Sequence, residues 1–148
     1  MMLGAVVATL AARTAFAADP FRGERVGQTR SIGDVTMIWA PPGRFRMGSP
    51  VGEPQRRDDD AQVEATLTKG FWIGRFAVTQ GQWRGLTGSM PGELSAGAGD
   101  LFPVYNLSHP EAETFCDLLT RRERAVGRLP AGWAFRLPTE AQWEYAAR

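Results

Sequence analysis

Short stretches in which apolar and polar side chains alternate mark the first half of the chain as strand-rich. Val35–Trp39 is composed of strand-favouring residues, and Arg44–Met47 alternates polar and apolar positions beyond the turn-prone Pro41–Gly43. A period of two is typical of strands that bury one face, so the two segments predict a hairpin with Phe45 and Met47 facing the core. Further strands are predicted at Val63–Leu67, Phe71–Ile73 and Phe76–Val78, the last two on either side of a turn at Gly74.

Helical patterns appear in the second half. Thr79 is placed to cap a helix over residues 80–86, and Ser108 with Glu111 forms a capping box. The apolar stripe that follows Ser108 repeats at i, i+3, i+4 and i+7: Ala112, Phe115, Cys116 and Leu119. Trp133–Leu137 is a predicted short strand, and Thr139 with Gln142 predicts a last helix. Strands with interspersed helices favour an α+β fold.

The N-terminus carries an export pattern. Leu3–Ala12 is apolar except for Thr9, and the small-x-small sequence Ala15-Phe16-Ala17 follows. We therefore predict a signal peptide over residues 1–17, cleavage after Ala17 and a periplasmic or secreted protein. The stretch falls short of the roughly 20 residues that span a bilayer, so no stable membrane anchor is expected. Because no basic residue precedes the stretch, a buried N-terminal helix is the alternative.

The domain limits follow from the same patterns. Residues 18–34 mix charge and glycine without periodicity and predict a flexible leader, so the domain itself is expected over residues 35–148. The 148-residue chain has room for one domain. Its 17 basic and 16 acidic side chains nearly cancel, so the chain has no large net charge that would attract it to nucleic acid. The chain ends at Arg148 inside a helix that has a good N-cap at Thr139 but no C-cap signal, which suggests that the sequence is truncated.

Few side chains are candidates for catalysis or for binding a metal or phosphate. His109 is the only histidine, so neither a triad with a second base nor a multi-histidine metal site is possible, and a surface role is expected. Cys116, the only cysteine, lies on the apolar stripe and is interpreted as core. Asp58–Asp60 could ligate calcium, but the spacing is not that of an EF-hand loop and a solvated loop is favoured. An arginine cluster could bind phosphate, although a helix C-terminus favours cations in any case: Arg121, Arg122, Arg124 and Arg128.

Three segments together resemble the formylglycine-generating enzyme family, also called the sulfatase-modifying factor domain. They are Met37–Ser49, Phe71–Trp83 and the stretch from Pro103 to the closing run Arg136–Arg148, which reads RLPTEAQWEYAAR. Their order and spacing match the family. Ala61 and Val63 stand where the family often has proline and histidine, and His109 replaces a frequent tryptophan.

The resemblance implies a mixed α+β fold related to C-type lectin domains. For enzymatic members it implies a copper-dependent oxidation of a cysteine in a sulfatase polypeptide to formylglycine. Their two copper-binding cysteines and their calcium-binding loops are expected outside this chain, and Cys116 matches a core position of the family. No catalytic, cofactor-binding or metal-binding residue is therefore assigned. Within the closing motif that Arg136, Glu140, Trp143 and Glu144 match, we expect Arg136 to pair with Glu140 and Trp143 to fill the core.

Two functional hypotheses follow. The first is an exported member of this family that lacks the half of the domain carrying the active site. The second is a non-catalytic module that binds a ligand or protein through loops such as Ser49–Asp60 and Gly85–Gly99. The related domain of ergothioneine-type sulfoxide synthases is a third possibility, but nothing in the sequence resembles their histidine-rich iron domain.

Overall fold

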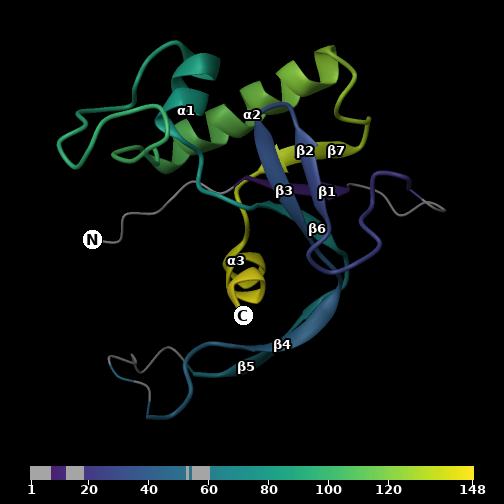
Figure 1. Cartoon of the computed structure of the whole chain (residues 1–148). Helices are drawn as coiled ribbons and strands as arrows, with labels where there is room; N and C mark the ends of the chain where they lie inside the picture. The colour runs from purple at the N-terminus through teal and green to yellow at the C-terminus, as the bar shows by residue number, and fades with distance from the viewer. Residues whose placement is uncertain (1–7, 13–18, 53, 55–60) are drawn as a thin grey trace.

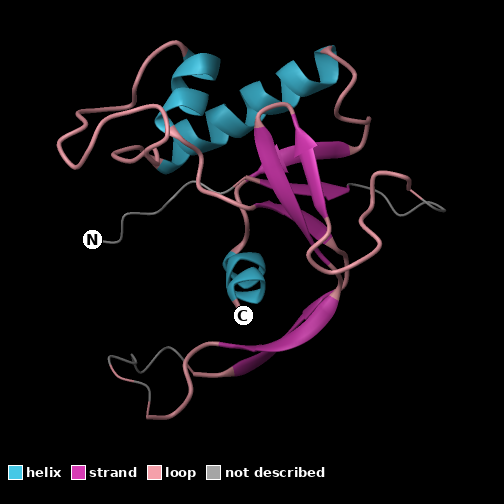
Figure 2. Ribbon diagram, in the orientation of Figure 1, coloured by secondary structure: helices cyan, strands magenta, loops and turns pink. Residues whose placement is uncertain are grey.

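The computed structural model describes residues 8–12, 19–52, 54 and 61–148, which form three helices and seven strands in two sheets (Figures 1 and 2). In chain order the elements are β1 (Thr9–Ala12), β2 (Thr29–Ile32), β3 (Val35–Ala40), β4 (Gly43–Met47), β5 (Val63–Leu67), β6 (Phe71–Gly74), α1 (Gln80–Thr87), α2 (His109–Ala125), β7 (Trp133–Arg136) and α3 (Glu140–Ala147). The predicted α+β class is confirmed.

The larger sheet has the strand order β2-β3-β6-β1-β7, and all its neighbouring strands are antiparallel. Helices α1 and α2 lie together beside it, and α2 contacts β7 (Figure 1). Trp83 of α1 stacks on Phe115 of α2 with ring centroids 5.0 Å apart. The core between these layers is built from fully buried side chains of both: Leu10, Met37, Trp72, Phe115, Leu119 and Phe135.

The predicted helix starts are confirmed. Thr79, Ser108 and Thr139 each form a capping box, in which the hydroxyl accepts from the third helical N–H and the side chain at that third position accepts from the cap N–H. The apolar stripe of α2 is buried as expected. Gly127 follows the end of α2 with a φ of +73°, a left-handed conformation that glycine adopts without strain.

The strand predictions need two corrections. β3 and β4 do not form a hairpin, because β3 pairs with β2 and β6 whereas β4 pairs with β5 in the smaller sheet. Phe45 and Met47 are consequently half-buried instead of lying in the main core. Phe76–Val78 is not a strand either. β6 already includes Gly74 and ends there. Val78 lies beside Val104, whose N–H donates to the Val78 carbonyl over 2.9 Å.

The N-terminal region also differs from the prediction. Within the expected leader, β2 pairs with β3, and Phe21 is 7% exposed with its ring 5.0 Å from that of Trp133. The folded region therefore begins well before residue 35. Residues 1–7 and 13–17 of the predicted signal peptide lie outside the described residues, and residues 9–12 form β1, a strand and not the alternative helix. Within the described ranges, no helix combines the length and apolarity needed to cross a membrane.

Candidate functional site

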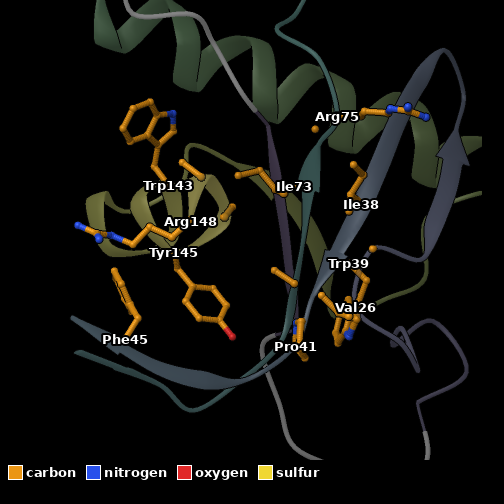
Figure 3. Close-up of a pocket in the computed structure, with 15 residues that line it drawn as sticks. Val26, Ile38, Trp39, Pro41, Phe45, Ile73, Arg75, Trp143, Tyr145 and Arg148 are labelled. Carbon is orange, nitrogen blue, oxygen red and sulfur yellow. The ribbon is translucent and has the colours of Figure 1, made fainter. Parts of the chain in front are cut away.

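An apolar cleft of about 580 Å³ separates α3 from the five-stranded sheet (Figure 3). Its sheet side is formed by β3 and the end of β6, and its other side by β4 and α3. The principal lining side chains are Ile38, Trp39, Phe45, Ile73, Trp143 and Tyr145. A concave, mostly apolar surface of this size is the usual form of a small-ligand or peptide site, so it is the first candidate.

Trp143 does not fill the core, contrary to the sequence prediction. It is 52% exposed, and none of the residues of α3 is buried. Figure 3 shows its indole pointing away from Phe45 and Tyr145. The second expectation for this motif is also wrong: Arg136 and Glu140 are both exposed, and no ion pair joins them within the described part of the chain. The structure thus leaves a half-exposed tryptophan at the cleft.

Tyr145 fixes α3 against the strands. Its ring centroid lies 5.3 Å from that of Phe45 and 6.5 Å from that of Phe71, both in tilted geometry. Its hydroxyl reaches over Gly43, where an added Cβ would lie 2.2 Å from the Tyr145 oxygen. Glycine at position 43 therefore allows the close approach of α3 to β4.

A polar clasp, formed by Glu144, Arg148 and Gly48, holds the end of α3. The Gly48 N–H donates to the two carboxylate oxygens of Glu144 over 2.9 and 3.2 Å. Arg148 donates to the Gly48 carbonyl over 2.9 Å and to Glu144 over 2.6 Å. Gly48 has a φ of +97°, which places both of its backbone groups toward α3 without side-chain strain. The clasp positions one side of the cleft.

Comparison with known proteins identifies the domain. The family profile described as "Sulfatase-modifying factor enzyme 1-like domain" (FGE-sulfatase) matches residues 24–148. The chain belongs to the FGE-sulfatase family. The solved structure of PvdO from Pseudomonas aeruginosa is similar to it, with a TM-score of 0.54 and 21% sequence identity. That match covers 69% of this chain and 46% of PvdO, so this chain spans less than half of the PvdO chain, and the likeness concerns the fold alone. A search of curated proteins gave no match.

The single thiol of this FGE-sulfatase chain is buried in the core, as predicted. Cys116 is 2% exposed, and desolvation, reinforced by Asp117 and Glu113, raises the pKa of its thiol to about 12. Another hollow on the protein is lined by both Cys116 and His109. His109 is 72% exposed with Nδ1 3.6 Å from Glu113, which agrees with the predicted surface role. A protonated thiol is a poor metal ligand and nucleophile. Among the described residues, no group of three His, Cys, Asp or Glu side chains could hold a metal ion.

The arginine cluster of α2 is largely engaged within the fold. Arg122 and Arg128 both donate to Glu123, through Nε atoms 2.8 and 2.6 Å from its carboxylate oxygens. Arg124 donates to the Trp133 carbonyl over 2.6 Å, while Arg121 is exposed. These contacts favour a structural role over phosphate binding. Sequence reasoning missed Glu123, which is 0% exposed, although it lies four residues after Leu119 on the buried stripe.

The structure describes the two loops that were predicted to bind a partner to different extents. Asp58–Asp60 and residues 53 and 55–57 of the preceding loop lie outside the described residues, so neither calcium binding nor loop presentation is tested there. Residues 85–87 belong to α1, and the loop after it is pinned by Gln80, which is 1% exposed. The Gln80 amide donates to the Gly97 carbonyl and accepts from the Gly99 N–H, each over 3.0 Å. The far end of this loop is thus tied to α1.

Proposed function

We propose that this chain is an exported FGE-sulfatase family member that contributes scaffold and binding surface, and that the oxidation of a sulfatase cysteine to formylglycine requires residues outside it. Export is supported by the apolar Leu3–Ala12 stretch and the Ala15–Ala17 cleavage pattern. The expected location is the periplasm or the exterior, and the expected partner is a sulfatase polypeptide. Copper and calcium would be held by residues beyond this chain.

The observation that carries the proposal is the state of Cys116. Copper(I) in thiolate sites prefers soft sulfur ligands, and the thiolate is the ligand form. This chain has one cysteine, and its thiol is buried with a pKa of about 12. A single protonated thiol on the buried face of α2 does not supply the two-sulfur site that the family's oxidases use.

Prediction one tests this assignment with the full chain, copper(I) and a synthetic cysteine-containing sulfatase peptide. Mass spectrometry should detect no formylglycine, both for the natural chain and for Cys116→Ala. Because a pKa of about 12 leaves about a thousandfold less thiolate than the ordinary value of 9.0, Cys116 should react with Ellman's reagent about a thousandfold more slowly in the folded protein than in denaturant. Product formed by the natural chain and lost in Cys116→Ala would refute the proposal.

The cleft beside α3 favours a second candidate function, non-catalytic peptide binding. It combines about 580 Å³ of apolar volume with a half-exposed tryptophan. Large exposed aromatic side chains beside an apolar hollow are typical of surfaces that contact a partner. An extended peptide with one apolar side chain could cover Trp143 while its backbone stays solvated.

Prediction two uses the tryptophan indole N–H signals in a ¹H–¹⁵N NMR spectrum. Titration with the same sulfatase peptide should shift the signal of Trp143. The signal of Trp72 serves as an internal control, because that side chain is 0% exposed and its Nε1 donates to the Phe21 carbonyl over 2.9 Å. Trp143→Ala should weaken peptide binding about tenfold, the effect of losing roughly 1.4 kcal/mol of contact. Equal shifts of both indoles, or none at millimolar peptide, would argue against the cleft.

A further inference from the structure

The segment predicted to be removed on export contains an interior strand of the main sheet. β1 lies between β6 and β7 (Figure 1), where Leu10 pairs with Trp72 on one side and with Phe135 on the other. The sequence predicts cleavage after Ala17, beyond the end of β1. The same residues therefore complete the sheet and belong to the predicted export segment.

The side chains of this strand fit its position closely. Leu10 is 0% exposed and Ala8 is 1% exposed, both within the main hydrophobic core. Thr9, on the other face, is 2% exposed and donates its hydroxyl to the Arg136 carbonyl over 3.1 Å. The Gly74 N–H donates to the Ala8 carbonyl over 3.0 Å. The position thus selects a small residue, a hydroxyl and a large aliphatic side chain in succession.

The two strands that flank β1 are anchored independently of it. β6 pairs with β3 from Phe71 to Gly74. β7 is held by α2, because the Phe135 N–H donates to the Thr120 hydroxyl over 2.9 Å and Arg124 donates to the Trp133 carbonyl over 2.6 Å. The walls of the position consequently keep supports of their own when β1 is absent.

Removal of β1 would leave a gap that the walls cannot close by hydrogen bonding. Both walls are antiparallel to β1, so they are parallel to each other. At about 4.8 Å between paired strands, β6 and β7 stand about 9.6 Å apart, too far to bond directly. Each wall would then present unpaired N–H and C=O groups above an apolar pocket shaped for Leu10, and such groups are costly to leave unsatisfied.

We propose that the space between β6 and β7 is a strand-acceptor slot. In the uncleaved chain Ala8–Ala12 fills it, and after cleavage it binds an extended segment of another polypeptide, antiparallel to both walls. The segment that fits carries a small residue, a hydroxyl residue and a large aliphatic residue in that order. Main-chain hydrogen bonds to both walls supply affinity, and the aliphatic side chain supplies selectivity. This role rests on the export cleavage of the proposed function, but it goes beyond that function and does not depend on sulfatase binding.

The test uses the full chain with a thrombin site inserted after Ala17, which makes the result independent of export. After cleavage, we expect the released segment to stay bound in size-exclusion chromatography. An excess of a fluorescein-labelled peptide of residues 6–14 should replace it, as followed by anisotropy. The same peptide with Leu10→Asp should bind at least about tenfold more weakly, because a charge cannot enter the apolar pocket. A matched peptide with Thr14→Asp, changed outside β1, should bind like the natural sequence.

Two results would overturn the proposal. One is release of the segment without uptake of the peptide, whether or not the remainder stays folded. The other is equal affinity of the natural and Leu10→Asp peptides. A second measurement is needed in case the chain unfolds once it is cut. It uses the uncut protein with Cys116→Ser as the background and adds Thr9→Cys and Arg136→Cys. The two new cysteines should form an intramolecular disulfide, because the two positions are paired in register. Failure of that disulfide to form would show that β1 does not occupy the slot.

Discussion

Replacing Glu123 by alanine should lower the free energy of unfolding by about 3 kcal/mol. The carboxylate is 0% exposed and accepts hydrogen bonds from Arg122 and Arg128, and Arg122 also donates to Asp34 over 2.6 Å. Breaking a buried ion pair typically costs about 3–5 kcal/mol, and we expect the lower end because both arginines are partly exposed and can be rehydrated. Urea unfolding would measure the change.

The control for this variant lies on the same helix. Glu113→Ala removes a carboxylate that is 62% exposed, so its effect should stay within about 0.5 kcal/mol. A loss for Glu123→Ala no larger than for Glu113→Ala would contradict the buried ion-pair network.

The same network predicts a pH dependence. Desolvation raises the pKa of Glu123, but hydrogen bonds from Arg128 and Arg122 outweigh it and hold the pKa below its ordinary value of 4.5. The stabilisation is therefore complete above the unfolded pKa and is lost as the pH falls through the folded one. The stability difference between the natural chain and Glu123→Ala should shrink below about pH 4.5. An unchanged difference between neutral and strongly acidic pH would refute this assignment.

Gly23→Ala should lower stability by about 1–3 kcal/mol through overpacking. An added Cβ at this buried position would lie 2.2 Å from Cγ and 2.4 Å from Cδ2 of Trp39. That indole is 2% exposed and is held between Trp72 and Trp133, with ring centroids 5.1 and 6.5 Å away, so it has little freedom to move. The substitution also tests whether the segment before residue 35 belongs to the folded domain.

Gly85→Ala is the matched control for that experiment. Gly85 is exposed within α1, and nothing lies within 4 Å of an added Cβ. Alanine there should stabilise the protein by about 0.5–1 kcal/mol, because glycine loses more backbone entropy in a helix. Thermal unfolding of both variants should give shifts of opposite sign, and equal midpoints would mean that Gly23 does not pack on Trp39.

The features that the sequence predicted well are local. A capping box depends on residues three positions apart, so the boxes at Ser108 and Thr139 can be read from short windows of sequence. The apolar stripe of α2 depends only on the helical period and can be read from the residues that follow Ser108. Strand pairing depends on distant partners. The alternation in β4 predicted that Phe45 and Met47 share one face and that this face lies in the core, but it does not specify whether β3 or β5 lies alongside.

Two residues show where pattern and outcome diverge. Glu123 is charged, so its place on the buried stripe was overlooked, although nearby arginines at 122 and 128 could have signalled a paired carboxylate. Trp143 is apolar, and its helix pattern indicates a face suited to burial without saying what covers it. For β1, the apolar composition of an export segment and that of a buried strand are the same, so the sequence does not separate them.

The clasp at Gly48 has a mechanical consequence. Glu144 accepts a hydrogen bond from the N–H of Gly48, and Arg148 donates one to its C=O, so the residue directly after β4 ties α3 to the β4–β5 pair. Figure 1 shows this hairpin extending away from the five-stranded sheet, to which short links after β3 and before β6 join it. A rotation of β4 and β5 about those links would carry α3 with it, so we expect the width of the cleft to depend on how this pair of strands is oriented relative to the sheet.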